Sequence, residues 1–130
     1  MLKNIFKNHK IIHPITISFV LMIIVGSSLE GTSIPKSHIF TLDKLLHVIE
    51  YFIFGTLLYF SFTHFTKHSI ILTLILGTFY SFIDEFYQST VQGRTSSALD
   101  IIADIFGVIL SAFFVKFFFN SIENDKKANY

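Results

Sequence analysis

The sequence predicts an all-α integral membrane protein, a bundle of four transmembrane helices that forms a single domain over residues 1–130. Hydrophobic residues make up 52% of the chain, 17 residues are Phe, and only 15% are charged. A soluble domain of this length buries too small a fraction of its surface to hide so many apolar side chains. The apolar residues also fall into four blocks of about 20 residues, the length that crosses the hydrocarbon core of a bilayer.

The four predicted helices span roughly residues 11–29, 43–64, 69–87 and 98–119. The first follows a basic start and so resembles a signal peptide. Its apolar run is longer than a signal core, and residues 26–30 offer no small-x-small cleavage site, so we expect it to be retained. Pro14 is expected in its first turn, where a missing amide hydrogen costs little.

The connections between these blocks are polar. The short one at residues 64–68 makes the second and third helices an antiparallel hairpin. The charged tail at residues 120–130 is expected to fray.

Charge and cysteine content exclude several functions. The net charge is +1 and the cations lie at segment ends, so a nucleic-acid partner is not expected. The chain has no cysteine, which excludes disulfides, thiolate metal sites and thiol catalysis. No cofactor is expected, and no metal site is assigned because no ligand spacing such as H-E-x-x-H is present.

The distribution of cations predicts the orientation. With a cytoplasmic N-terminus, seven cations lie inside: Lys3, Lys7, Lys10, Lys67, Lys116, Lys126 and Lys127. Three lie outside: Lys36, Lys44 and Arg94. Cytoplasmic loops carry the excess of Lys and Arg, so both termini are predicted to be cytoplasmic.

Polar residues recur at helical spacing on three of the predicted helices. These residues are Asp43, His47, Glu50 and Tyr51 on the second helix, Ser81, Asp84, Glu85 and Gln88 on the third, and Asp100, Asp104, Gly107 and Ser111 on the fourth. A carboxylate facing lipid costs about 2.5–3.5 kcal/mol on insertion scales. We therefore expect the three stripes to face one another or a water-filled pocket near the outer end of the bundle. Ala103, Gly107 and Ser111, at four-residue spacing, would let the fourth helix approach its neighbours closely.

Several of these residues also have a structural interpretation. Asp43 in a first turn complements the helix dipole. Ser97 and Asp100 fit a capping signature, and His47 is more often an interhelical hydrogen-bonding residue than a ligand. Asp84 is harder to explain in this way, because neither capping nor the dipole favours an acid near a helix C-terminus. No role is assigned to His13, His38, His64 or His68.

Four short motifs, in order, resemble the VanZ-like membrane proteins. They are Asp43-Lys44-Leu45-Leu46-His47 through Tyr51-Phe52, then Asp84-Glu85-Phe86-Tyr87-Gln88, then Gly93-Arg94, and finally Asp100 with Gly107. The resemblance covers residues 42–111. Two positions depart from the family pattern: Gln92 stands where Pro is usual before Gly-Arg, and Asp104 stands where Asn is usual.

The resemblance implies a multi-pass protein of the bacterial cytoplasmic membrane, in a family named for low-level resistance to the glycopeptide teicoplanin. The resemblance implies that the functional residues are Asp43, His47, Tyr51, Asp84, Glu85, Gln88, Arg94 and Asp100. We add Asp104 to this candidate site, because it lies on the same helical stripe as Asp100.

Four functions remain open at this point. The first is binding or modification of a cell-envelope molecule, such as a lipid-linked one, at the outer face. The second is an enzyme that uses acid/base chemistry or a divalent metal on the Asp/Glu/His cluster. The third, a transporter, is disfavoured because the inner halves of the third and fourth helices carry no polar trail. The fourth is a structural clasp that only holds the helices together.

Overall fold

The computed structural model describes residues 8–30, 40–94 and 97–128. This part of the chain contains four helices and no strand: α2 (His9–Ser27), α3 (Phe40–Phe62), α4 (Ser69–Ser89) and α5 (Ala98–Ala128). Each helix contains a stretch long and apolar enough to cross a membrane, at His9–Ser27, Leu42–Phe62, Ser69–Ser89 and Ala98–Phe118. The prediction of an all-α, four-span membrane protein is therefore confirmed.

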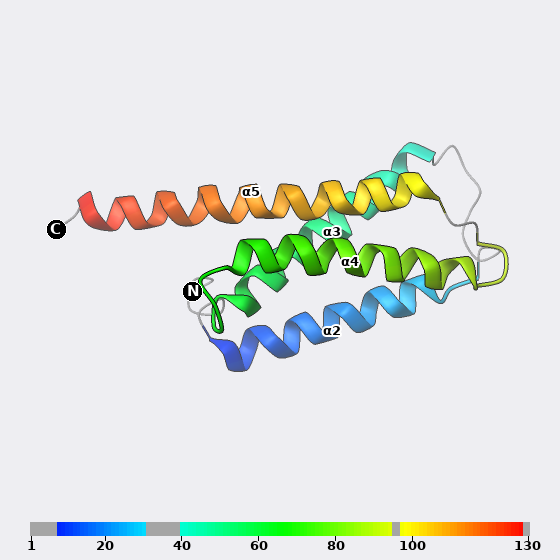
Figure 1. The fold of residues 1–130 in the computed structure, drawn as a ribbon, viewed down its shortest axis with the longest axis horizontal. Helices are drawn as coiled ribbons and strands as arrows, with labels where there is room; N and C mark the ends of the chain where they lie inside the picture. The colour runs from blue at the N-terminus through cyan, green and yellow to red at the C-terminus, as the bar shows by residue number, and fades with distance from the viewer. Residues whose placement is uncertain (1–7, 31–39, 95–96, 129–130) are drawn as a thin grey trace.

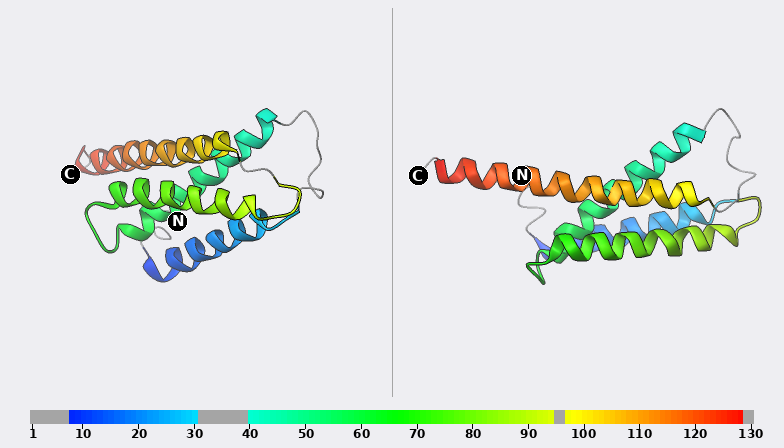
Figure 2. Two further views of the ribbon diagram at one scale, coloured as in Figure 1. Left: turned by 45° about the vertical axis from the view of Figure 1, so that its right-hand side comes forward. Right: turned by 45° about the horizontal axis from the view of Figure 1, so that its top comes forward.

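The four helices alternate in direction along the chain. α2 and α4 end at the same end of the bundle at which α5 begins (Figure 1). α3 also begins on this side and runs obliquely across the other helices, as Figure 2 shows from two directions. Its most extensive contact is with α5, and α2 packs mainly on α3.

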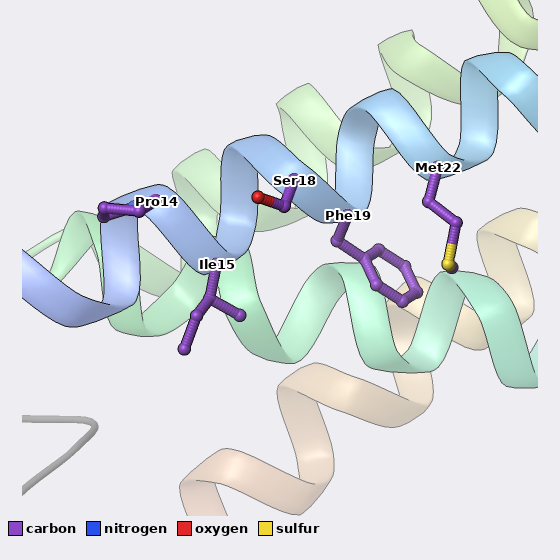
Figure 3. Close-up of a pocket in the computed structure, with 5 residues that line it drawn as sticks. All are labelled: Pro14, Ile15, Ser18, Phe19 and Met22. Atoms are coloured by element: carbon purple, nitrogen blue, oxygen red, sulfur yellow. The ribbon is translucent and has the colours of Figure 1, made fainter.

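α2 begins earlier than predicted because Asn8 caps it. The Asn8 side chain accepts a hydrogen bond of 3.1 Å from the Lys10 backbone N–H, and His9 is the first helical residue. Pro14 therefore lies in the second turn rather than the first, and the expectation for it was wrong. A proline at this position removes one hydrogen bond between successive turns. It borders a shallow groove of about 350 Å³ on the surface of α2, lined also by Ile15, Ser18, Phe19 and Met22 (Figure 3).

The other boundaries differ by a few residues, with one larger exception. α3 begins at Phe40 and ends at Phe62, and α4 continues to Ser89. α5 runs to Ala128, so the residues after 119 that were expected to fray are helical as far as the structure describes them.

The interior of this bundle is more polar than that of a soluble protein. Among the described residues, 13 buried side chains are polar or charged and 10 are hydrophobic. The outward faces carry large apolar side chains instead, such as Phe86, Phe113 and Phe117, which are 74%, 70% and 79% exposed. Together with four helices of spanning length, these apolar faces indicate a lipid environment, because soluble monomers rarely expose large apolar patches.

Small residues bring α3 and α5 close together, as the spacing of Ala103, Gly107 and Ser111 predicts. A Cβ atom added at Gly107 would overlap the Val48 carbonyl oxygen and lie 3.0 Å from the Phe52 backbone nitrogen. A Cβ atom added at Gly55 would overlap the Ser111 side chain. This close approach places the acidic residues of α5 directly against the polar residues of α3.

Candidate functional site

Polar side chains from all four helices gather where α2 and α4 end and α3 and α5 begin. We call this region the polar end. Its residues are Ser27, Asp43, Lys44, His47, Glu50, Tyr51, Ser81, Asp84, Glu85, Gln88, Arg94, Ser97, Asp100 and Asp104. All nine residues singled out from the sequence belong to this set, with Tyr51 at its inner edge, halfway along α3 and packed against Phe54 and Val108.

One group of contacts joins α3 to α5 around Asp100. The Lys44 ammonium group lies 2.9 Å from Asp43 Oδ2 and also donates a hydrogen bond to Asp100. His47 Nε2 lies 3.9 Å from Asp100 Oδ1. Asp100 is buried, whereas Asp43 is about half exposed, so Lys44 links an interior carboxylate to the surface of the bundle.

Asp104, one turn further along α5, connects three helices. Its Oδ1 lies 2.8 Å from His47 Nδ1 on α3, and its Oδ2 accepts a 2.9 Å hydrogen bond from the Ser81 hydroxyl group on α4. The residue is completely buried. Both carboxylate oxygens therefore have a polar partner in the interior, which offsets much of the cost of burying this group.

A second group of contacts is centred on Asp84 and joins α2 to α4. The Ser27 hydroxyl group donates a 2.5 Å hydrogen bond to Asp84 Oδ1, and the Gln88 amide donates a 3.0 Å bond to Asp84 Oδ2. The same amide nitrogen lies 3.2 Å from Ser27 Oγ. The Arg94 guanidinium group donates to the Gln88 side-chain oxygen. Arg94, in the loop after α4, thus reaches Asp84 through Gln88.

Glu85 fixes the start of α5. Its Oε1 accepts a 2.5 Å hydrogen bond from the Ser97 backbone N–H, and the Ser97 hydroxyl group accepts a 3.2 Å bond from the Leu99 N–H. In a capping box, the backbone N–H of the cap residue is bound by an acid three residues later in the same helix. Here Glu85, from α4, accepts that hydrogen bond instead. The capping interpretation is therefore correct for Ser97, but Asp100 contacts Lys44 rather than the cap.

Two polar atoms at this end are buried without a hydrogen-bond partner in the described residues: the Tyr51 hydroxyl oxygen and Glu85 Oε2. Tyr51 is 0% and Glu85 is 2% exposed. An unpaired buried donor or acceptor costs about 1–3 kcal/mol, so such atoms in a native interior call for an explanation.

The two groups of contacts share an electrostatic environment. Glu50 on α3 is close enough to His47 and Asp104 of the first group and to Asp84 and Arg94 of the second to interact with their charges. Among the described residues, the polar end holds six carboxyl groups against the two fixed cations Lys44 and Arg94, with His47 as a further titratable base. This imbalance favours a ligand or ion that carries positive charge.

Within the part of the polar end that the structure describes, Asp43, His47 and Asp100 are arranged so that they could hold a metal ion. One ligand atom from each lies within 4.8 Å of the others. Oxygen-rich sites of this kind suit magnesium, calcium or manganese. However, the Lys44 ammonium group already binds both carboxylates, so an ion would have to displace it.

The sequence interpretation did not assign roles to two members of the polar end. Lys44 was counted as an outer cation and stands in the first motif, but it was given no partner, although it directly follows Asp43 and a buried acid needs a cation nearby. Ser27 was considered only as part of a cleavage site. A hydroxyl residue near the end of an apolar helix gives no signal of its partner, since that partner lies 57 residues away.

Comparison with known proteins gives one match, to a protein family. A family model described as VanZ/LLP1 matches residues 2–119. The chain belongs to the VanZ/LLP1 family. The matched residues include α2, so the match covers all four spans. It is therefore longer than the segment 42–111 that contains the four motifs. No match is found among curated proteins or among solved structures.

Proposed function

We propose that the polar end binds or modifies a cell-envelope molecule at the outer face of the bacterial cytoplasmic membrane, and that this activity raises tolerance to teicoplanin. The observation that carries the proposal is the chain of contacts from Ser27 through Asp84 and Gln88 to Arg94. It links a buried acid to a half-buried cation in the loop after α4.

The charges suggest the class of ligand. Arg94 is suited to a phosphate group, which a guanidinium group can bind through two hydrogen bonds. The excess of carboxyl groups behind it favours a positively charged group, such as an amine, on the same molecule. A lipid-linked envelope precursor that carries both a phosphate and an amino group fits this pattern, because its lipid part stays in the bilayer beside the helices.

The unpaired atoms support binding in the same region. A bound ligand or ordered water would supply partners for the Tyr51 hydroxyl group and for Glu85 Oε2, which are otherwise costly to bury. A carboxyl group beside a bound substrate is also suited to moving a proton.

The test is the teicoplanin and vancomycin susceptibility of a sensitive Gram-positive host that expresses the protein. The wild type, Asp84→Asn, Arg94→Ala and Arg94→Lys are compared at equal expression. Lys67→Ala serves as the matched control, because Lys67 is an exposed cation in the turn at the opposite end of α4. We expect the wild type and Lys67→Ala to raise teicoplanin tolerance and the Asp84→Asn and Arg94→Ala variants not to.

A wild type without any effect on susceptibility would contradict the proposed role in teicoplanin tolerance. Full activity of both Asp84→Asn and Arg94→Ala would contradict the assignment of the polar end as the working site.

A metal-dependent enzyme is the second candidate, and the arrangement of Asp43, His47 and Asp100 favours it. It predicts that magnesium or manganese binds the purified protein and that Asp100→Asn removes this binding. Lys44→Met should then strengthen metal binding, because the competing ammonium group is gone. Binding that is unchanged in Asp100→Asn would exclude this candidate.

A structural clasp is the third candidate, since every carboxyl group of the two contact groups already has a partner within the bundle. It predicts that Asp84→Asn lowers thermal stability in detergent as well as activity. Loss of tolerance with unchanged stability would instead favour a working site.

A further inference from the structure

Three histidines meet at the opposite end of the bundle, where α2 begins and α3 ends. His9 and His13 lie one turn apart on α2, and His64 lies in the turn directly after α3. The ring centroids of His9 and His13 are 6.2 Å apart. The His64 ring lies 5.7 Å from each of the other two. The three rings thus form a nearly equilateral triangle built from two separate segments.

The backbone around these rings is held by a well-packed contact between α2 and α3. Ile12, completely buried, packs in a cluster with Leu57 and Phe60. One turn further, the Thr16 and Ser61 hydroxyl groups lie 2.8 Å apart. The His64 turn is closed by hydrogen bonds of 2.9 and 3.0 Å from the Phe65 and Thr66 N–H groups to the Phe62 carbonyl oxygen. The separation of the three histidines is therefore fixed by the fold.

The His13 ring is also held in place. It stacks on Phe65 with 5.1 Å between the ring centroids and 15° between the ring planes. The rings of His9 and His64 are exposed, and they are tilted by 51° and 79° to that of His13. The nitrogen atoms of the three rings do not all lie within 4.8 Å of one another as the rings stand. A metal ion would therefore require the two exposed rings to rotate about their side-chain bonds, which would move no buried side chain.

Three imidazole groups at this separation are a donor set for a transition-metal ion. Two histidines four residues apart on one helix face are a recurring pair in zinc sites. Three imidazoles hold zinc with metal–nitrogen distances of about 2.0–2.1 Å, which leaves a fourth position for water. Imidazole also suits copper and nickel, whereas magnesium and calcium prefer oxygen. The chain has no cysteine, so no thiolate competes for such an ion.

We propose that His9, His13 and His64 form a site for a zinc-type transition-metal ion at this end of the bundle. A bound ion would cross-link the start of α2 to the turn after α3. The site is separate from the polar end, since the two lie at opposite ends of the same helices, and it does not depend on the function proposed above.

The test is isothermal titration of the purified full-length protein with Zn²⁺ in detergent, using an affinity tag that contains no histidine. We expect one Zn²⁺ per chain. His13→Ala and His64→Ala should each lower the affinity at least tenfold. His68→Ala removes a histidine of the neighbouring turn that lies outside the triangle, and it should bind like the wild type. Asp100→Asn should also leave this zinc binding unchanged, which separates the site from the acidic residues at the polar end.

Copper provides a second measurement that does not depend on affinity. The electron paramagnetic resonance spectrum of the Cu²⁺-loaded wild type should show hyperfine splitting from several imidazole nitrogens, with fewer in His64→Ala. Circular dichroism and size-exclusion chromatography check that each variant is folded.

Absence of Zn²⁺ binding by the wild type would overturn the proposal. So would wild-type affinity in both His13→Ala and His64→Ala, or loss of binding in Asp100→Asn alone.

Discussion

Nδ1 of His47 lies 2.8 Å from Oδ1 of Asp104, and this contact ties α3 to α5 at a point that is closed to solvent. Residue 104 is a position at which the resemblance to the VanZ-like proteins implies asparagine. The same side chain also receives the Ser81 hydroxyl group, so residue 104 connects three helices. The structure explains how either residue type can serve here, because both side chains have two polar atoms in the same positions.

Asp104→Asn should therefore be well tolerated. The asparagine oxygen can accept from His47, and its amide can donate to the Ser81 oxygen, so we expect the free energy of unfolding to change by less than about 1 kcal/mol. Asp104→Leu should lower it by about 1–3 kcal/mol, because His47 and Ser81 are then left buried without this partner. Thermal unfolding in detergent measures both, and equal stability of the two variants would contradict the connecting role of residue 104.

Ser27→Ala should weaken the attachment of α2 to α4. The mutation removes the 2.5 Å hydrogen bond to Asp84, and interhelical bonds in membranes contribute about 0.6 kcal/mol on average and up to about 1.7 kcal/mol. Ser18→Ala is the matched control, because Ser18 is an exposed serine on the same helix. Chemical or thermal unfolding in mixed micelles gives the difference. A Ser27→Ala variant as stable as Ser18→Ala would indicate that the hydrogen bond adds nothing to stability.

Gly107→Ala should destabilise the bundle, although alanine is ordinarily the better helix former. Its methyl group would overlap the Val48 carbonyl oxygen, which belongs to the backbone and cannot rotate away. Gly26 is the control, since a Cβ atom added there meets nothing within 4 Å. We expect Gly26→Ala to be neutral or to stabilise by up to about 1 kcal/mol. The melting temperature should therefore fall in Gly107→Ala and stay unchanged or rise in Gly26→Ala.

The predicted orientation is open to a direct test, because the chain contains no cysteine. Gln92 and Lys67 are exposed residues in loops at opposite ends of α4. On intact cells, a membrane-impermeant maleimide should label the Gln92→Cys variant and not the Lys67→Cys variant. The reverse pattern would place both termini outside, and the polar end would then face the cytoplasm.

The polar residues of single helices could be assigned from sequence, but their partners could not. Helical spacing correctly places Ser81, Asp84 and Gln88 of α4 and Asp104 of α5 in the interior, because carboxyl groups avoid lipid. It cannot determine that Ser97 pairs with Glu85, or Lys44 with Asp100, since these contacts depend on the relative rotation and depth of two helices. The small residues Gly55 and Gly107 control that packing, and their effect becomes clear only when the facing helix is known.

The helix boundaries show the same limit on a smaller scale. Hydropathy identifies the apolar stretch of a helix and says little about polar turns at its ends, which is why His9, Lys10 and the residues after Phe119 were left outside the predicted helices. One hydrogen bond from the Asn8 side chain is enough to extend α2 to His9 and to move Pro14 into the second turn.

The length of α5 has a practical consequence for imaging. The helix continues for ten residues from Phe118, the end of its apolar span, to Ala128. At 1.5 Å per residue, this adds about 15 Å of rod beyond the span. A rigid helical protein fused in register to this rod would report the orientation of the whole bundle. A chain of 130 residues is too small to align by itself in electron micrographs, and this fusion would give it a fiducial marker without touching either group of interior polar residues.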